Sequence, residues 1–230
     1  MSEMQIYASS RRLDARYIGT IDYKQAWDMQ KAYVVEIDKE ERNETLLLLQ
    51  HLPTYTLGTD RNPEHLLLSE PELAAKGISV YNIDRGGDIT YHGPGQLVGY
   101  PLIYIDANGL DLRGFLRNVE QVIIDWLAQH GIKAGRKQGY TGVWFNDEKI
   151  AAIGMKFNKA RKRRGFITSH GFALNIKSGI ATEGFSGIVP CGIQNFGVTS
   201  FNDITGQSLS VEEAALQIIP MFKHKFGYSG

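Results

Sequence analysis

The sequence predicts an α+β fold, in which a few helices pack on a mixed, largely antiparallel sheet. Candidate strands occur in hairpins rather than in regular alternation with helices, and amphipathic segments separate the groups of strands. A chain of 230 residues suits one large domain, and no Pro-, Ser- or Gly-rich linker divides it. We therefore expect a single domain over residues 1–230.

The first predicted helix covers residues 22–42. Asp22 and Gln25 have the spacing of a capping box, and apolar residues then recur every three or four positions. Residues 46–51, which begin with four leucines, follow as a buried strand, and Pro53 ends it.

A short helix is expected over residues 69–77 and a strand over residues 78–83. The clearest helix of the chain comes next, at residues 111–130. Its apolar side chains form one stripe at helical spacing, and Gly131 is well placed to end it.

A β-hairpin is expected from residues 142–145 and 149–154, because a polar turn separates two β-prone runs. Residues 170–176 predict another strand. Ser210 and Glu213 form a capping box that begins a final helix.

Charge and composition exclude several classes of protein. Lys plus Arg and Asp plus Glu both number 25, so the chain lacks the basic excess of a protein that holds nucleic acid by its overall field. No apolar run is long enough to span a bilayer, and residues 1–7 do not resemble a signal peptide. We expect a soluble, cytoplasmic protein with no membrane contact.

Cys191 is the one cysteine of the chain, so an intrachain disulfide or a site of several thiolates is impossible. A lone cysteine is most often a small buried apolar residue. Cys191, however, stands between Pro190 and Gly192 in a predicted loop. To act as a nucleophile its thiol would need a nearby cation or base, for which Lys149, His92 and His170 are candidates.

The densest group of polar and turn residues runs from Arg85 to Gln96, with the sequence RGGDITYHGPGQ. Two consecutive turns would account for its glycines and proline. The arginine, tyrosine and histidine between them favour a site, because Gly86 and Gly87 let backbone N–H groups approach a ligand. The stretch is neither a Walker loop nor a dinucleotide fingerprint.

Residues 159–164 form the one marked basic run, KARKRR. As part of the fold it reads as a solvated loop between strands. Because the chain as a whole has no net charge, the run creates a local positive field, which speeds encounter with an acidic partner.

Four segments, in this order, resemble the signature blocks of the lipoyl(octanoyl) transferase family. They are residues 85–101, 149–154, 170–175 and 190–192. The resemblance implies a biotin/lipoate ligase-like fold. It also implies transfer of an octanoyl group from acyl carrier protein to a lysine of a lipoyl domain or of glycine-cleavage H protein.

By this resemblance Cys191 carries the acyl thioester, and Lys149 lowers the pKa of its thiol and assists proton transfer. No metal or other cofactor is implied, because the thioester donor is already activated. The resemblance also implies a set of substrate-binding residues in three groups: Arg85, Gly86, Gly87, Asp88, Ile89, Thr90, Tyr91 and His92; Ala152, Ile153 and Gly154; Gly171, Phe172 and Ala173.

Two other functions remain open at this point. An ATP-dependent lipoate or biotin ligase of similar fold would use the glycine-rich stretch for phosphate contacts and leave Cys191 idle. A non-catalytic module would bind acylated carrier proteins without a covalent step. The sequence also leaves open whether His92 or His170 moves protons.

Overall fold

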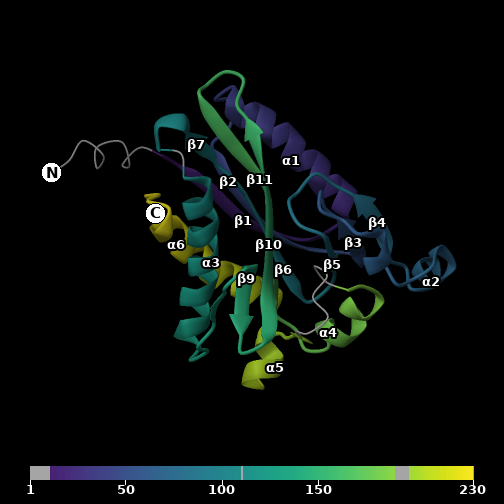
Figure 1. Ribbon diagram of the computed structural model, residues 1–230. Coiled ribbons are helices and arrows are strands. Elements are labelled where there is room, and N and C mark those ends of the chain that lie inside the picture. The colour runs from purple at the N-terminus through teal and green to yellow at the C-terminus, as the bar shows by residue number, and fades with distance from the viewer. Residues whose placement is uncertain (1–10, 110, 190–196, 230) are drawn as a thin grey trace.

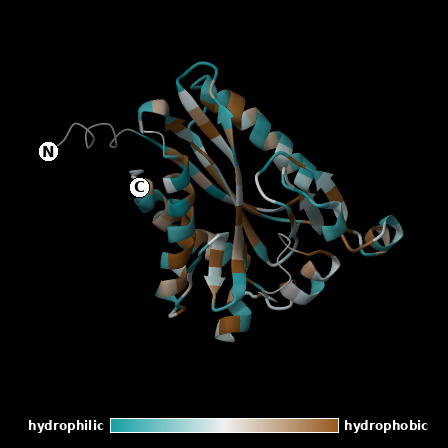
Figure 2. Ribbon diagram, viewed as in Figure 1, coloured by the Kyte–Doolittle hydropathy of each residue, from teal (hydrophilic) through white to brown (hydrophobic). Residues whose placement is uncertain are grey.

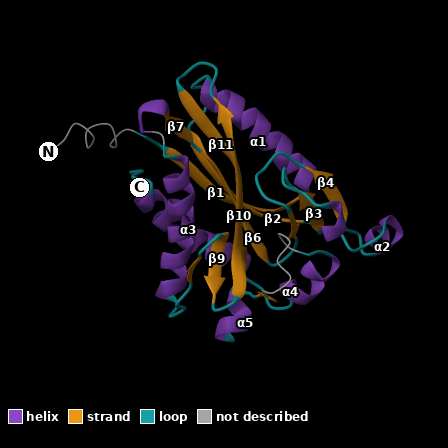
Figure 3. Cartoon of the chain, viewed as in Figure 1, coloured by secondary structure: helices purple, strands orange, loops and turns teal. Residues whose placement is uncertain are grey.

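The computed structural model describes residues 11–109, 111–189 and 197–229. Their larger sheet lies between two layers of helices, with a smaller sheet beside it (Figures 1 and 3). The larger sheet has the strand order β1 (Leu13–Ile21), β2 (Glu44–His51), β6 (Gln96–Leu102), β11 (Gly165–Asn175), β10 (Glu148–Lys159), β9 (Tyr140–Phe145) and β8 (Gly135–Lys137). Two short strands pair with it off this path, β7 (Tyr104–Asp106) with β11 and β12 (Gly197–Val198) with β10.

The smaller sheet has the order β4 (Ser79–Asn82), β3 (Thr54–Leu57) and β5 (Ile89–His92). The helices are α1 (Tyr23–Asp38), α2 (Glu70–Ala75), α3 (Leu112–Gln129), α4 (Ile180–Glu183), α5 (Phe201–Thr205) and α6 (Val211–Lys225). The neighbours β2, β6, β11, β10, β9 and β8 are antiparallel, whereas β1–β2, β3–β4 and β10–β12 are parallel. The predicted α+β class with a mixed, largely antiparallel sheet is confirmed.

Local signals place the helices close to their predicted positions. The Asp22 carboxylate accepts a hydrogen bond from the Gln25 N–H at 3.1 Å, and Ser210 forms the predicted capping box with Glu213. The first helix nevertheless ends at Asp38 rather than at residue 42, because Glu40 has a left-handed φ of 64°. β4 is slightly shorter than its predicted range of residues 78–83, whereas β10 and β11 are longer than predicted. β10 continues to Lys159 and β11 begins at Gly165, so the basic run is the turn of a hairpin.

The apolar residues of the larger sheet separate onto its two faces, and brown segments line the sheet and the inner sides of the helices (Figure 2). One face packs against α3 and α6, where Trp126, Ile123 and Phe222 are fully buried. The other face packs against α1 through Leu47, Leu49 and other residues. A third apolar cluster joins the smaller sheet to α2 and α4.

One carboxylate joins both ends of the described chain to the larger sheet. Glu44 on β2 forms an ion pair with Arg11, whose Nε lies 3.0 Å from Oε2. The Tyr228 hydroxyl donates to the same oxygen at 2.7 Å, and the Tyr104 N–H donates to Oε1 at 2.8 Å. Burial, and then the Glu44 charge, raise the pKa of Tyr228, so its hydroxyl stays protonated and able to donate.

Glycines at the centre of the sheet let backbone and ring lie close together. A Cβ on Gly171 would lie 2.0 Å from the Gly99 carbonyl oxygen, and one on Gly99 would lie 2.2 Å from the Phe172 ring. Neither Gly99 nor Gly171 can therefore carry a side chain without a shift of the sheet.

We expect Gly171→Ala to lower the free energy of unfolding by at least about 2 kcal/mol, because its methyl group would overlap backbone. Gly135→Ala on β8 is the matched control, since nothing lies within 4 Å of its Cβ position. It should change the free energy of unfolding by no more than about 0.5 kcal/mol. Urea unfolding of both variants measures the difference, and equal effects would contradict the packing argument.

Candidate active site

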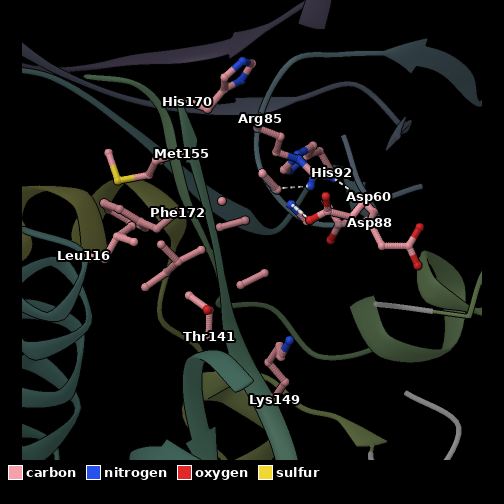
Figure 4. A pocket seen from close by; sticks show the side chains of 18 of the residues that line it. Asp60, Arg85, Asp88, His92, Leu116, Thr141, Lys149, Met155, His170 and Phe172 are labelled. Atoms are coloured by element: carbon pink, nitrogen blue, oxygen red, sulfur yellow. Dashed lines mark hydrogen bonds between the residues drawn. The ribbon is translucent and has the colours of Figure 1, made fainter. Parts of the chain in front are cut away.

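A cavity of 560 Å³ opens between β10, β11, the smaller sheet and the segment before β5. This volume falls in the range typical of small-molecule sites. Most of the residues that the sequence singled out line it: Arg85, Gly86, Gly87, Asp88, Thr90, His92, Lys149, Ala152, Ile153, Gly154, His170, Gly171, Phe172 and Ala173. Three sequence segments that are far apart, within residues 85–92, 149–154 and 170–173, therefore meet at one place (Figure 4).

The glycine-rich loop is fastened to an edge of β10 by backbone contacts. β10 pairs with β9 only as far as Ala151, and beyond this point the Gly86 N–H donates to the Met155 carbonyl at 3.1 Å. A Cβ on Gly154 would lie 2.8 Å from the Gly86 oxygen. Gly154 is thus needed so that the loop can lie directly on the strand.

The Arg85 side chain holds the same loop from within and is only 8% exposed. Its Nη2 donates to the carbonyls of Thr56 and Asp88, both at 2.8 Å, and to the Thr56 hydroxyl at 3.0 Å. Nη1 donates to the Gly86 carbonyl at 3.0 Å. The guanidinium thus joins β3 to the loop.

The N–H groups of the loop glycines are already engaged within the protein. The Gly86 N–H is bound to Met155, as described above, and the Gly87 N–H donates to the Asp60 carboxylate at 3.0 Å. In this arrangement they are not donors for a ligand, although the sequence suggested such a role. A Cβ on Gly86 would meet only an ordinary contact, 3.6 Å from the Met155 carbonyl oxygen, whereas Gly87 has a left-handed φ of 89° that favours glycine.

Successive side chains of β5 point to opposite faces of the smaller sheet, and this separates the remaining predicted residues of the stretch Arg85–His92 into two pairs. Thr90 and His92 line the cavity. Ile89 and Tyr91 are not among the lining residues and belong to the apolar cluster beneath the smaller sheet. Burial raises the pKa of Tyr91 to about 12.

Asp88 contacts a histidine that the sequence did not single out. Its carboxylate pairs with Nδ1 of His65 and accepts the Asn62 N–H at 3.0 Å. Asp60 and His65 both line the cavity. Figure 4 shows Asp60 and Asp88 together on its right flank. The order Asn-Pro-Glu-His of residues 62–65, a turn and capping pattern, was the one available signal.

The opposite flank is apolar. Leu116 from α3, Met155 from β10 and Phe172 from β11 gather there (Figure 4). Leu116 and Met155 also lay outside the predicted set. A hydrocarbon chain placed along this flank gains about 0.8 kcal/mol for each methylene group that it buries.

Lys149 enters the cavity from the beginning of β10, at the lower end in Figure 4. Its Nζ lies 4.9 Å from the centre of the Trp144 ring. The strands β8 and β9 are fixed by the buried Glu120, whose carboxylate pairs with Arg136 on β8 and accepts the Gly142 N–H on β9 at 3.1 Å.

His170 lies at the other end of the cavity. It pairs with Met155, six residues along β10 from Lys149, which corresponds to roughly 20 Å. Its Nε2 lies 2.9 Å from Asp84, which also pairs with Lys156. Burial lowers the pKa of His170, and the hydrogen bond from His170 lowers that of Asp84. At this distance His170 does not exchange protons with Lys149.

His92 is held as a neutral ring by its surroundings. Its Nδ1 lies 2.8 Å from the Gln96 amide oxygen, so this nitrogen carries the proton. Burial, and then the nearby His51, lower the pKa of His92 well below its usual value. Tyr23 and Tyr100 also line the cavity, and neither was among the predicted substrate-binding residues.

Cys191 lies outside the described residues, as do Pro190 and Gly192. The described chain on either side is attached to the walls of the cavity. The Val189 N–H donates to the His65 carbonyl at 2.8 Å, and Val198 pairs with Lys149.

The basic run lies at the tip of the β10–β11 hairpin, away from Lys149 (Figure 1). Asp38 accepts the N–H groups of Arg161 and Lys162 at 2.9 and 3.2 Å. Arg163 pairs with Glu40 and stacks on the Tyr104 ring at 3.8 Å. The tip is thus bound to the end of α1 rather than being a loose loop.

No three His, Cys, Asp or Glu side chains gather as metal ligands within the ranges that the structure describes. In the same ranges no helix is both long and apolar enough to cross a membrane.

Comparison with known proteins supplies the family. Residues 22–223 match the lipoyl protein ligase A/B catalytic domain. An octanoyltransferase of Chloroflexus aurantiacus is 41% identical over 218 residues, which cover 94% of this chain and 95% of the relative. An octanoyltransferase of Rubrobacter xylanophilus is 40% identical over 229 residues, covering 99% of this chain and all of the relative.

Solved structures resemble the fold at low sequence identity. A bi-partite lipoate protein ligase from Thermoplasma acidophilum has a TM-score of 0.68 and 15% identity, covering 95% of this chain and 86% of its own. A biotin protein ligase from Aquifex aeolicus, solved with biotin and ATP, has a TM-score of 0.52 and 14% identity, covering 93% of this chain and 70% of its own. The biotin/lipoate ligase-like fold expected from the sequence is confirmed.

The buried His51 predicts a loss of stability in mild acid. Burial lowers its pKa to about 4, while its Nδ1 donates to the Ile21 carbonyl and its Nε2 accepts the Tyr100 hydroxyl at 2.7 Å. Below pH 6.5 the unfolded chain therefore binds a proton that the folded chain does not, and the contribution of His51 falls by about 2 kcal/mol between pH 7 and pH 5.

His51→Gln keeps a donor for Ile21 and an acceptor for Tyr100 but does not titrate. We expect its free energy of unfolding to fall by about 2 kcal/mol less than that of the wild type over this range. Urea unfolding at pH 7 and pH 5 measures both. Parallel losses in the two proteins would show that His51 is not the group responsible.

Proposed function

The chain belongs to the lipoyl protein ligase A/B catalytic domain family and is an acyltransferase, and we propose that it transfers octanoyl groups during protein lipoylation. The proposed donor is octanoyl acyl carrier protein. The proposed acceptors are lysines of lipoyl domains and of glycine-cleavage H protein. The observation that carries the proposal is one cavity in which Lys149 stands at the end of an apolar flank.

We propose Cys191 as the nucleophile and Lys149 as the group that activates it. The Cys191 thiolate attacks the donor carbonyl, and the carrier thiolate leaves with a proton from the Lys149 ammonium. The acyl group is then held as a thioester on Cys191. An ammonium beside the thiol favours its ionised form and so lowers its pKa.

In the second step the neutral amine of the acceptor lysine attacks the thioester. An amide forms, the Cys191 thiolate leaves, and the Lys149 amine takes the proton that the attacking nitrogen loses. The exchange needs no oxidant, metal or nucleotide, because the thioester supplies the activated acyl group. A thiol used in this way must stay reduced, so we propose that the protein works in the cytoplasm.

The cavity supports an acyl substrate in two ways. Leu116, Met155 and Phe172 offer an apolar surface for the hydrocarbon chain. Ala152 and Ala173, which pair across β10 and β11, leave room beside it because their side chains are small. We propose that these residues, together with Ile153, Gly154 and Gly171, form the acyl-binding wall.

The loop Arg85–His92 is proposed as the wall opposite. Its direct contribution comes from Thr90, His92 and the backbone of Gly86 and Gly87. Arg85 and Asp88 line the cavity and also hold the loop in place. Ile89 and Tyr91 support the loop from the far side of β5.

Incubation of the protein with octanoyl acyl carrier protein, without ATP, should raise its intact mass by one octanoyl group. Addition of a lipoyl domain should then remove the added mass and place it on the acceptor. Cys191→Ser should show no octanoyl thioester that hydroxylamine releases. A Cys191→Ser protein with normal turnover would refute the proposed mechanism, and an adduct that forms only with ATP would favour a ligase.

Lys149→Met should slow alkylation of the single cysteine near neutral pH at least tenfold, because a thiolate without its cation returns toward the usual pKa of about 8.5. Lys137→Met is the matched control. Lys137 lies over the same Trp144 ring, at 5.4 Å, but does not line the cavity. Equal alkylation rates in the two variants would remove Lys149 from the proposed role.

A further inference from the structure

Two buried side-chain amides, Gln96 and Asn175, connect the cavity wall to the strand that carries Lys149. Gln96 is 1% exposed and Asn175 is 3% exposed. They pair with each other across β6 and β11. Gln96 ends the glycine-rich stretch that begins at Arg85, and Asn175 ends the block of residues 170–175. The proposed function gives neither amide a role.

Their hydrogen bonds run in one direction. His92 donates from Nδ1 to the Gln96 oxygen at 2.8 Å, and the Gln96 amide donates to the Asn175 oxygen at 3.0 Å. Gln96 also donates to the Tyr91 carbonyl at 3.1 Å, which fixes its orientation because only the NH₂ end donates. Asn175 donates in turn to the Thr199 carbonyl at 3.0 Å.

Thr199 links these hydrogen bonds to Lys149. The Thr199 N–H donates to the Lys149 carbonyl at 3.1 Å, and the preceding Val198 pairs with Lys149 as β12. β9 lies along the other edge of β10, where Trp144 pairs with Lys149. β12 therefore occupies the edge that β11 leaves after Leu174, the last β11 residue to pair with β10.

Asn175 is the last residue of β11 and lies next to the point at which β12 replaces β11 as the partner of β10. Because no β11 residue pairs with Lys149, the position of β12 beside it depends on contacts outside the β10–β11 ladder. The Asn175 amide supplies one such contact from a buried position, where a donor left without a partner would keep the full cost of its desolvation.

We propose that Asn175 is a positioning residue, which through Thr199 holds β12 against Lys149 and so sets where the Lys149 side chain enters the cavity. This inference rests on the proposed function of Lys149. Asn175 touches no reacting atom, and its effect reaches the chemistry only through the backbone of Lys149.

The test uses Asn175→Asp and Asn175→Ser in the full-length protein. The aspartate keeps the size of the side chain but turns an acceptor toward the Thr199 carbonyl, and the serine removes the donor without adding a charge. For each variant and the wild type, the rate of alkylation of the single cysteine by iodoacetamide is measured across pH 6–10. The kcat and KM for octanoyl transfer are measured as well.

Asn158→Asp is the matched control. Asn158 also donates from its amide within the β10–β11 pair, to the Ile167 carbonyl at 3.0 Å and the Ser169 hydroxyl at 2.9 Å, but toward the hairpin tip. Thermal melting of all variants shows how much stability each change removes.

We expect both Asn175 variants to raise the alkylation midpoint by at least half a pH unit and to slow alkylation at pH 7 at least threefold. The kcat should fall at least tenfold while KM for the donor stays within twofold. Asn158→Asp should leave all three values within twofold of the wild type. A shift in Asn175→Asp alone would come from its added charge and not from the lost donor, and it would overturn the proposal. Asn175 variants that behave like Asn158→Asp would overturn it as well.

The same data separate this inference from the proposed function. A wild type that forms no octanoyl adduct refutes the function itself. A wild type that forms the adduct, with Asn175 variants that keep its alkylation profile, refutes only the positioning role.

Discussion

The cavity depends on one close approach of backbone to backbone, where the Arg85–Asp88 loop lies on the open edge of β10. Gly154 allows the contact, and the Arg85 guanidinium fastens the loop to β3 on its other side. The contact closes an edge of the sheet that β9 leaves beyond Ala151. It also brings the smaller sheet, with Thr90 and His92, over the larger one. The glycine-rich stretch, which the sequence suggests as a ligand-binding loop, therefore also connects the smaller sheet to the larger one.

The sequence predicts best what depends on local chemistry. The amphipathic stripe of α3 and the capping residues of α1 and α6 act within a few positions of each other, so their signals survive without tertiary context. The family resemblance also brings together most of the residues that line the cavity. β1 was not predicted, because its polar and small residues are stabilised by parallel pairing with β2 rather than by an apolar pattern. The length of β10 was underestimated, since beyond Ala151 it is held by β11 and by the glycine-rich loop rather than by β9, the strand that the sequence pairs with it.

The site shows the same limit in its long-range contacts. Leu116 reaches the cavity from a helix whose stripe indicated only core packing, and Tyr23 reaches it from the first turn of α1. The histidines could not be ranked from sequence, because the answer is a matter of distance along β10 and of hydrogen-bond partners. The structure places His170 with Asp84 at the end remote from Lys149, and gives His92 an amide partner that keeps its ring neutral.

The contacts of Glu44 have a consequence for local unfolding at the two ends of the described chain. Arg11 and Tyr228 bind the same carboxylate, so the residue that leads into the edge strand β1 and the residue that follows α6 share a single anchor. Fraying at either end removes a partner from a largely buried charge and so weakens the attachment of the other end. We therefore expect the two extremities of the described chain to detach from the sheet together rather than independently.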